Sequence, residues 1–351
     1  MKIIIAAAGT GGHINPGIAI ANIIKSHHKD AEILFIGTSR GLENDLVPRA
    51  GYKLAQIDAY GISRSLTIKN IKNIYKTLRG FGEAKKIIKE FKPDIVIGTG
   101  GYICAPVISV AHKLNIPTVL HESNAFPGVT VKILSKKVDK ILLGFEDAKT
   151  RLPKAKASVV TGTPTKIKKL DLDKNSIIKI KNDLKISLSL PVVLVFGGSQ
   201  GAKSINEALL EIIKQKKNKN YQIIWACGKS GYEAITKELS GIKSQNVLIL
   251  PYIYNMEEVM NIADLIVSRS GALTITEITN VHKPAIFVPY PYATENHQEY
   301  NAKVLENVGA AKIILDSNLN AKVLQKEIDK IISSPRKCSE YGKIYLQSIY
   351  K

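Results

Sequence analysis

A glycine-rich turn near the start of the chain, residues 9–16, contains the residues best suited to chemistry. An apolar run, residues 3–8, ends there in three glycines within four residues, and His13 is the only titratable side chain of the turn. Glycine lets the backbone approach a ligand closely, and the N-terminus of a following helix favours negative charge. We expect Asn15 to cap that helix and Pro16 to occupy its first position. Because imidazole titrates near neutral pH, His13 is a candidate general base, with phosphate binding as the alternative role.

Two further glycine-rich turns, at residues 98–102 and 197–201, also follow apolar runs. A turn between a strand and a helix can present backbone N–H groups to an anion. None of the three turns is a standard nucleotide fingerprint. Ile14 stands where a dinucleotide motif needs its third glycine, and Ala202 stands where a P-loop needs the glycine before its lysine. A turn that only packs the chain is the alternative, but matching turns in the two halves of the chain favour ligand binding.

Polar side chains gather where later apolar runs stop. The segment His121-Glu122-Ser123-Asn124 ends one run, and ligands bind beyond the carboxyl ends of parallel strands. Capping or a hydrogen-bond network is the alternative role for this segment. Glu277 falls about one turn inside a helix expected after Gly271, where a carboxylate either accepts both hydroxyls of a ribose or faces solvent. Asn296 and Gln298 follow another run, and amides both donate to and accept from the hydroxyls of sugars.

The sequence holds no pattern for metal or serine-nucleophile chemistry. Its cysteines and histidines lack zinc spacing, no Asp-x-Asp directly follows a strand-like run, and Gly-x-Ser-x-Gly is absent. We therefore expect neither a metal nor a cofactor, and a diphosphate would be held by N–H groups, helix N-termini, and Lys or Arg. The three cysteines form no motif, which is typical of a reducing compartment.

Apolar runs alternate with helix-periodic segments along almost the whole chain, which indicates βαβ units and parallel sheets with helices on both faces. The first half contains runs at 2–8, 32–36, 94–98, 118–121 and 140–143. After a lysine-rich stretch, the second half contains runs at 191–196, 222–226, 247–250, 265–267, 285–288 and 312–315. We predict an α/β protein of two Rossmann-like domains, residues 1–163 and 164–335, with the active site in the cleft between them. Residues 336–351 are expected to form a last helix, for which packing on the first domain is one option.

The chain carries 50 Lys and Arg against 30 Asp and Glu, a formal net charge of +20. Nucleic acid, an anionic membrane and phosphorylated substrates are all compatible partners of such a surface, and an ordinary solvated lysine-rich surface is the alternative. No apolar run reaches the roughly 18 residues that a membrane-spanning helix needs, and the first residues do not resemble a signal peptide.

Residues 66–92 form a basic stretch with apolar residues largely at spacings of three and four. A basic helix with an apolar stripe suits a membrane surface. The alternative is a helix that packs Ile71, Ile74 and Leu78 into the core and solvates its lysines. The residues expected on the membrane side are Ile71, Lys72, Ile74, Tyr75, Lys76, Leu78, Arg79 and Phe81. Nucleic-acid binding needs aromatic stacking along a basic groove, and this stretch offers only Tyr75, Phe81 and Phe91, so we expect no nucleic acid.

The motifs at 9–16, 100–102, 121–124, 197–202, 269–272 and 297–298 together resemble, in order, those of a GT-B glycosyltransferase family of bacterial peptidoglycan synthesis. The resemblance covers nearly the whole chain. It implies a GT-B fold and a peripheral enzyme at the cytoplasmic face of the cell membrane. It also implies inverting transfer of N-acetylglucosamine from its UDP donor (UDP-GlcNAc) to the C4 hydroxyl of N-acetylmuramic acid in undecaprenyl-diphospho-N-acetylmuramoyl-pentapeptide (lipid I), giving the β-1,4-linked lipid II.

The resemblance further implies which residues bind each substrate. Donor contacts are expected from Thr10, Gly11, Gly12, Ser199, Gln200, Gly201, Ile253, Ala272, Leu273, Thr274, Glu277, His297 and Gln298. Acceptor contacts are expected from Gly12, Gly101, Tyr102, Asn124 and Lys166, with the 66–92 helix facing the membrane. For the chemistry, His13 is the first candidate for general base, and Glu122 is the reserve base or the partner that orients a histidine.

A few positions depart from the family pattern. Lys166 stands where the family usually has arginine, so it keeps the charge but loses the bidentate fork. Ala8 stands where a further glycine is common, and Lys203 stands where arginine is common.

An alternative function is a GT-B transferase or epimerase that uses another nucleotide-sugar and a soluble acceptor. That alternative predicts activity without lipid and no binding to vesicles.

Overall fold

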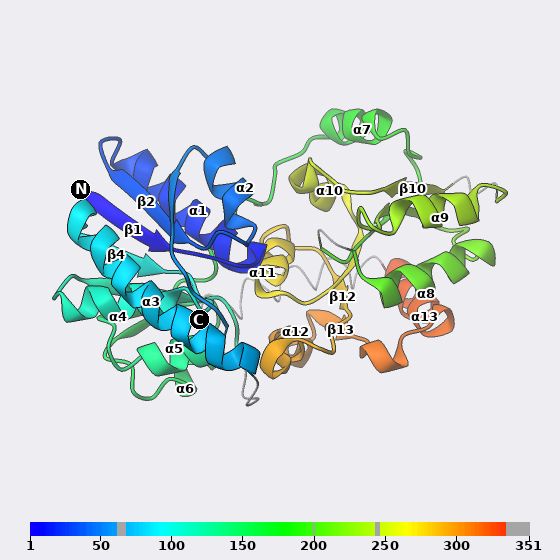
Figure 1. The fold of residues 1–351 in the computed structure, drawn as a ribbon. Coiled ribbons are helices and arrows are strands. Elements are labelled where there is room, and N and C mark those ends of the chain that lie inside the picture. Colours follow the sequence, from blue (N-terminus) through cyan, green and yellow to red (C-terminus); the bar gives the residue numbers. More distant parts are fainter. Residues whose placement is uncertain (62–67, 199–200, 243–245, 335–351) are drawn as a thin grey trace. The chain divides into compact units, whose positions relative to one another are not determined.

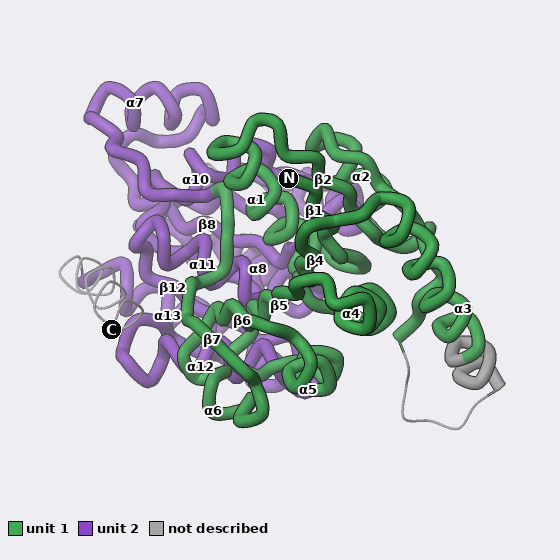
Figure 2. Tube along the Cα trace, turned by 90° about the vertical axis from the view of Figure 1, so that its left-hand side faces the viewer, with its two compact units in different colours: residues 1–166 green, residues 167–351 purple. Residues whose placement is uncertain are grey.

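The computed structural model describes residues 1–61, 68–198, 201–242 and 246–334. The chain divides into two compact units, Met1–Lys166 (unit 1) and Ile167–Lys351 (unit 2), which Figure 2 distinguishes by colour. Residues 336–351, expected to be a helix, and the expected donor residues Ser199 and Gln200 lie outside the described residues. Each unit is built around its own parallel sheet, as the alternation of apolar runs and helical segments predicts.

Unit 1 contains a 7-stranded parallel sheet in the order β3-β2-β1-β4-β5-β6-β7. Figure 1 labels its strands β1, β2 and β4. Its strands are β1 (Lys2–Ala6), β2 (Glu32–Gly37), β3 (Lys53–Gln56), β4 (Ile95–Gly98), β5 (Thr118–Glu122), β6 (Lys140–Leu143) and β7 (Ser158–Val160). Its helices are α1 (Gly11–His27), α2 (Glu43–Arg49), α3 (Ile68–Phe91), α4 (Cys104–Lys113), α5 (Val129–Leu134) and α6 (Asp147–Thr150). Because the strands are all parallel, the turns that follow β1, β4 and β5 meet at one edge of the sheet.

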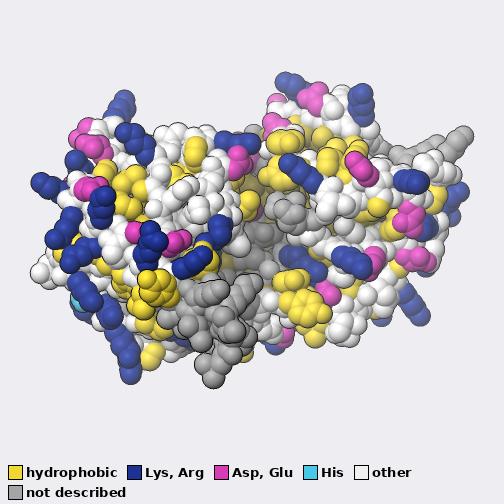
Figure 3. Space-filling view, in the orientation of Figure 1, with side chains coloured by type: hydrophobic (Ala, Val, Ile, Leu, Met, Phe, Trp, Pro, Cys, Tyr) yellow, Lys and Arg dark blue, Asp and Glu magenta, His cyan; other side chains and the backbone are white. Residues whose placement is uncertain are grey.

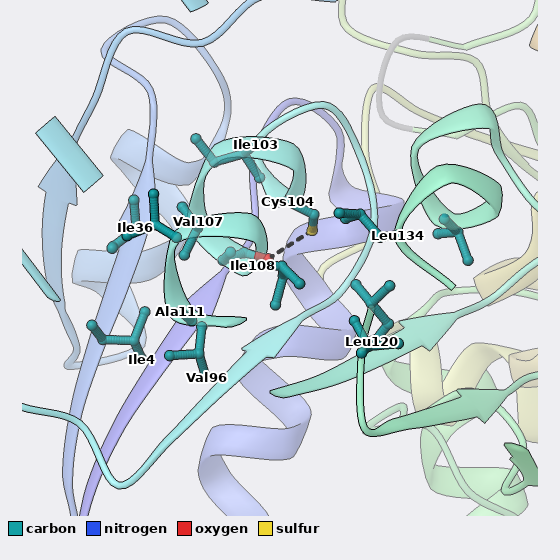
Figure 4. Close-up of a cluster of buried hydrophobic side chains, with 14 of the residues drawn as sticks. Ile4, Ile36, Val96, Ile103, Cys104, Val107, Ile108, Ala111, Leu120 and Leu134 are labelled. Carbon is teal, nitrogen blue, oxygen red and sulfur yellow. Dashed lines mark hydrogen bonds between the residues drawn. The ribbon is translucent and has the colours of Figure 1, made fainter. Parts of the chain in front are cut away.

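Helices cover both faces of the unit 1 sheet. On one face, Ile14 of α1 and Val47 of α2 pack with Ile5 and Phe35 of the central strands. On the other face, α3 to α6 pack against the sheet around a cluster that includes Val107 of α4 (Figure 4). Full burial of each such side chain contributes about 1.5–3 kcal/mol, so these two layers hold the β1, β4 and β5 ends in place.

Helix α1 begins at Gly11, with Thr10 in the capping position, which corrects the expected start at Asn15 and Pro16. The Thr10 carbonyl accepts hydrogen bonds from the N–H groups of His13 and Ile14, and these bonds form the first turn. Pro16 therefore lies inside the helix, where its ring faces the carbonyl of Gly12, the residue four positions earlier. As a result, His13 lies in the first turn of the helix and not in a loop before it.

Helix α3 is the long basic helix expected over 66–92, and its described part shows both predicted features. Phe81 and Phe91 pack against the buried cluster, which corrects the expectation that Phe81 faces the membrane. Tyr75 and Leu78, however, are 73% and 63% exposed, and Lys76 and Arg79 are exposed beside them. The side chains of Ile71, Lys72 and Ile74 lie outside the described residues. Figure 3 shows Lys and Arg spread over this face of unit 1, with hydrophobic side chains exposed among them.

Unit 2 contains a 6-stranded parallel sheet in the order β10-β9-β8-β11-β12-β13. Its strands are β8 (Val192–Phe196), β9 (Gln222–Ala226), β10 (Val247–Leu250), β11 (Leu265–Ser268), β12 (Ala285–Phe287) and β13 (Ala311–Ile313). Its helices are α7 (Lys174–Asp183), α8 (Lys203–Lys214), α9 (Tyr232–Leu239), α10 (Met256–Ile262), α11 (Ala272–Asn280), α12 (His297–Asn307) and α13 (Ala321–Ile332), with short 3-10 turns at Thr294–Asn296 and Asp316–Asn318. The turns after β8, β11 and β12 again meet at one edge of the sheet.

Candidate functional site

His13 is joined to Thr99, in the turn after β4, by two hydrogen bonds. The imidazole Nδ1 lies 3.2 Å from the carbonyl oxygen of Thr99, and the Thr99 hydroxyl donates to the carbonyl of His13 at 2.7 Å. A carbonyl oxygen only accepts, so Nδ1 carries the hydrogen in this contact. In the neutral ring, the lone pair that can accept a proton is then on Nε2, as a general base requires.

Two glycines enclose the imidazole of His13. Gly100 and Gly101 have φ of +99° and +77°, a left-handed backbone that suits glycine. A Cβ at Gly100 would lie 2.7 Å from Nδ1 of His13, and one at Gly101 would lie 3.2 Å from Cδ2. The glycine turn after β4 therefore permits the close approach of the His13 ring, in addition to any approach of a ligand. The ring of Tyr102, which follows, lies beside Gly9, 3.8 Å from a Cβ placed there.

Glu43, at the start of α2, supports the Gly9 turn, and the sequence motifs did not predict this. Its side chain is fully buried, and its carboxylate accepts the N–H of Gly9 at 2.9 Å, together with the N–H and hydroxyl of Thr38 at 2.8 and 2.7 Å. The N–H of Gly9 is thus bonded within the protein, which leaves the N–H groups of Gly11 and Gly12, at the start of α1, to face a ligand. Two glycines leave room for this side chain: a Cβ at Gly37 would lie 2.6 Å from Glu43 Cγ, and a Cβ at Gly41 would overlap the Glu43 carboxylate.

Glu122 anchors the loop that follows β5. Its Oε1 accepts the backbone N–H and the side-chain amide of Asn124 at 2.9 and 3.0 Å, and its Oε2 accepts the N–H of Gly128 at 2.9 Å. Burial raises the pKa of Glu122, while the hydrogen bonds from Asn124 and Gly128 lower it. These contacts use both oxygens of the carboxylate and hold Asn124 at the sheet edge. They form the kind of hydrogen-bond network that the alternative role for this segment predicts.

His121 is buried and points toward the end of unit 1. Its Nε2 donates to the carbonyl of Gly162 at 3.1 Å, and Ser123 lies 3.3 Å from Nδ1. Burial lowers the pKa of His121 to about 4; the Gly162 carbonyl opposes this and the nearby His13 adds to it. His121 is therefore neutral at physiological pH and acts as a fixed donor to Gly162. Lys166, the last residue of unit 1, is exposed.

In unit 2, Arg269 joins the loops at the carboxyl edge of the sheet. Its guanidinium donates to the carbonyls of Val288 and Pro289, both at 3.1 Å, to the hydroxyl of Ser204 at 3.0 Å, and pairs with Asp316 at 2.5 Å. Its side chain is only 13% exposed. Arg269 thus fixes the segments after β11, β12 and β13 relative to the start of α8.

The start of α11 follows Arg269 directly. Gly271 occupies the capping position with extended backbone, and Ala272, Leu273 and Thr274 form the first turn, whose N–H groups have no acceptor within the helix. The hydroxyl of Ser270 is buried, and no described residue forms a hydrogen bond with it. Glu277 is half-buried one turn further along. This helix start has the donor set that binds a phosphate.

Gln298, in the first turn of α12, is oriented by the loop after β12. The backbone N–H of Tyr290 donates to Gln298 Oε1 at 2.9 Å, so the amide presents its NH₂ group, a donor, on its other side. His297 is half-buried beside it, and Asn296 donates to Glu299 at 2.6 Å. Tyr290 and its neighbour Tyr292 form an edge-to-face pair with ring centroids 5.7 Å apart.

The remaining expected donor residues lie on neighbouring turns. Ile253 is buried after β10, between the more exposed Tyr252 and Tyr254. Gly201, with φ of +77°, lies so close to the carbonyl of Cys227 that a Cβ would overlap it. Among the described residues, no group of three or more His, Cys, Asp or Glu is placed to hold a metal ion. Within the same part of the chain, no helix has the length and hydrophobicity needed to cross a bilayer.

Comparison with known proteins gives consistent matches. Residues 3–143 match the glycosyltransferase family 28 N-terminal domain, and residues 192–345 match the C-terminal domain of that family. A protein of Acetivibrio thermocellus is 44% identical over 98% of this chain and 92% of its own length, and one of Bacillus cytotoxicus is 43% identical over 95% and 90%. Both are named UDP-N-acetylglucosamine–N-acetylmuramyl-(pentapeptide) pyrophosphoryl-undecaprenol N-acetylglucosamine transferase.

Solved structures similar to this chain agree with the family matches. Acinetobacter baumannii MurG has 28% identity and a TM-score of 0.76, with 99% of this chain and 94% of that chain covered. The UDP-GlcNAc 2-epimerase of Neisseria meningitidis has a TM-score of 0.64 at 15% identity, covering 100% of this chain and 96% of that one, and shares the fold alone. The expected GT-B architecture of two Rossmann-like domains is confirmed.

Proposed function

This chain belongs to glycosyltransferase family 28, and we propose that it transfers N-acetylglucosamine from UDP-GlcNAc to lipid I, giving lipid II. The observation that carries the activity is the identity of 43–44% with enzymes named for this transfer, over at least 95% of this chain. The chain is thus a UDP-GlcNAc-dependent hexosyltransferase of cell-wall synthesis. The two sheet edges divide the substrates, with the acceptor on unit 1 and the nucleotide on unit 2.

For the donor, the proposed site is the carboxyl edge of the unit 2 sheet. The N–H groups at the start of α11, from Ala272 to Thr274, stabilise the diphosphate, and Glu277 accepts the ribose hydroxyls. Gln298 donates its NH₂ group to a hydroxyl of the sugar, because its oxygen is already used by Tyr290. His297, Ile253 and Gly201 complete this site. Ser199 and Gln200, outside the described residues, and Thr10, Gly11 and Gly12 of unit 1 are donor contacts that only the family resemblance implies.

For the chemistry, we assign the proton transfer to His13. The C4 hydroxyl of the muramoyl sugar attacks the anomeric carbon of UDP-GlcNAc, its proton passes to Nε2 of His13, and the electron pair of the broken C–O bond leaves with UDP. Attack opposite the leaving group inverts the anomeric centre and gives the β-1,4 link. A positioned base contributes about 100- to 10,000-fold. Glu122 holds Asn124 for the acceptor, so His13 is the better-placed base.

For the acceptor, the proposed contacts are Gly12, Gly101, Tyr102 and Asn124 on unit 1, with Lys166 at its end. Exposed Tyr75 and Leu78 among the lysines of α3 support attachment of unit 1 to an anionic membrane surface. We assign the reaction to the cytoplasmic face of the membrane, in keeping with its nucleotide-sugar donor. The partners are then UDP-GlcNAc, lipid I and the membrane, and nucleic acid is not among them.

A transfer assay tests the activity. Radiolabelled UDP-GlcNAc is offered with a short-chain lipid I analogue, and label is expected in the lipid product. UDP-GlcNAc binding is measured in parallel by calorimetry. Saturable binding without transfer to the analogue would contradict the assigned acceptor, and loss of both would contradict the assigned function.

A further inference from the structure

Two cations of unit 1 converge on one aromatic ring. The guanidinium carbon of Arg40 lies 3.6 Å from the ring centroid of Tyr60, and Nζ of Lys76 lies 5.1 Å from the same centroid. Arg40 also donates to the carbonyl of Ala59 at 2.6 Å, and Lys76 donates to the Tyr60 hydroxyl at 3.2 Å. We call Arg40, Tyr60 and Lys76 the Tyr60 cluster. Its members come from three different segments, so tertiary structure alone brings them together.

The surrounding backbone holds the Tyr60 cluster in place. The N–H of Tyr60 donates to the hydroxyl of Thr77 on α3 at 3.2 Å, and the N–H of Asp58 donates to Glu83 at 2.7 Å. Helix α3 packs so closely here that a Cβ at Gly80 would overlap the carbonyl of Asp58. The Tyr60 ring, which both cations contact, is therefore held in position without a ligand.

The Tyr60 cluster adjoins the turns proposed for the acceptor. The ring of Tyr102 lies 3.8 Å from a Cβ placed at Gly9 and 3.8 Å from one placed at Gly61, the residue after Tyr60. On the other side, the N–H of Leu42, two residues after Arg40, donates to the carbonyl of Gly9 at 3.4 Å. Arg40 and Tyr60 are thus each within two residues of a contact with the Gly9 or Tyr102 turn.

The charges of the Tyr60 cluster are unbalanced. In the described part of the chain, neither Arg40 nor Lys76 forms an ion pair with a carboxylate. Of the five N–H groups of the Arg40 guanidinium, the contact with Ala59 uses one. Two like charges beside one ring repel each other, and a doubly charged anion between them removes that repulsion. The planar guanidinium fork matches the oxygens of a phosphate.

We propose that Arg40 and Lys76, held by Tyr60, bind a phosphate group of the lipid-linked acceptor. This inference rests on the proposed function, because the acceptor carries a diphosphate next to the sugar that reacts. The N–H groups of Gly11 and Gly12 supply dipoles at the same edge of the sheet, while the Tyr60 cluster supplies full positive charges. The site thus recognises the diphosphate of the acceptor and has no role in donor binding.

Steady-state kinetics with a short-chain acceptor in detergent, without phospholipid, test the proposal. Arg40→Gln and Lys76→Gln are each expected to raise the acceptor KM by about ten- to a hundredfold, as expected for loss of a charge-assisted hydrogen bond, with the UDP-GlcNAc KM unchanged. Arg40→Lys, which keeps the charge without the fork, is expected to fall between wild type and Arg40→Gln. The matched controls Arg49→Gln on α2 and Lys113→Gln on α4 remove exposed charges elsewhere on unit 1 and are expected to leave both KM values unchanged.

Two further measurements separate the outcomes. An acceptor analogue with one phosphate in place of two is expected to lower the ratio between the Arg40→Gln and wild-type KM values. An unchanged acceptor KM, or a loss confined to vesicle binding, would overturn the proposal and assign the Tyr60 cluster to membrane phospholipid. A wild-type enzyme that transfers no label would instead contradict the proposed function itself.

Discussion

His13 and Thr99 hold each other by a reciprocal pair of hydrogen bonds, with Nδ1 of His13 3.2 Å from the Thr99 carbonyl and the Thr99 hydroxyl 2.7 Å from the His13 carbonyl. The residues are separated by 86 positions: His13 lies in the first turn of α1, which follows β1, and Thr99 lies in the turn after the neighbouring strand β4. The pairing fixes both the ring and its tautomer, so the basic lone pair of the neutral ring is on Nε2.

His13→Gln is expected to lower kcat by about 100- to 10,000-fold, the usual contribution of a positioned general base. A base is active only when unprotonated, so the wild-type rate should rise with pH along an acid limb that the variant lacks. The measurement is kcat against pH with a short-chain acceptor. A variant that keeps the acid limb and only raises the acceptor KM would assign His13 to phosphate binding.

Gly100→Ala is expected to lower kcat by about 10- to 100-fold, because its Cβ would lie 2.7 Å from Nδ1 of His13 and would displace the base. Gly51→Ala is the matched control, since Gly51 also has positive φ, +84°, but has open space around it. Both variants should lose about 1 kcal/mol of stability from backbone strain, measured by urea unfolding. Equal kcat in the two variants would show that His13 does not need the Gly100 turn.

The architecture was predictable because the strands of both sheets are short, continuous runs of Ile, Val and Leu, which are typical of parallel sheets buried on both faces. The helical start of α1 was not, because the bonds that form its first turn go to the Thr10 carbonyl and no side chain marks them. The sequence predicted Pro16 as the first residue of the helix. It lies instead in the second turn, where its ring faces Gly12, four residues earlier.

Only those parts of the site that local sequence motifs mark could be predicted. The polar segment after β5 was recognised, but its partition into a loop anchor, Glu122, and a buried donor, His121, depends on contacts with Gly128 and Gly162 that spacing does not reveal. Glu43 was missed because it bonds Gly9 from 34 positions away. Arg40 was missed for the same reason, since its aromatic partner, Tyr60, lies on another segment.

Glu43→Gln is expected to destabilise the protein by about 2–3 kcal/mol. The NH₂ group of the glutamine would replace one acceptor oxygen, so a donor would face the backbone N–H of Gly9 or of Thr38. Urea unfolding measures the loss. The matched control is Glu32→Gln on β2, whose side chain is 63% exposed and which should change stability by less than about 0.5 kcal/mol. Equal stability of Glu43→Gln and wild type would contradict a stabilising role for these hydrogen bonds.

The burial of His121 predicts a pH dependence of stability. Its pKa falls from 6.5 to about 4 in the native state, so between these values the unfolded chain binds more protons than the native protein. Stability from this group is therefore complete above pH 6.5 and is lost as the pH falls toward 4, by about 3 kcal/mol. Urea unfolding of wild type and His121→Gln across this range isolates the effect, because Glu122 titrates in both. Parallel curves for the two proteins would contradict it.

The last prediction concerns attachment of α3 to the membrane. Leu78 is 63% exposed beside Lys76 and Arg79, and burial of a leucine in the membrane interface contributes about 1.5–3 kcal/mol. Leu78→Glu also adds a charge that anionic lipids repel, so its affinity for anionic vesicles should fall at least about tenfold in a flotation assay. Ile178→Glu on α7 is the matched control: that isoleucine is 42% exposed but lies in unit 2, and its substitution should leave binding unchanged. Turnover of a short-chain acceptor in detergent should be equal in all three proteins, because the apolar contact serves the membrane and not the chemistry. Equal loss of vesicle binding in both variants would show that net charge, and not the α3 surface, attracts the enzyme to the membrane.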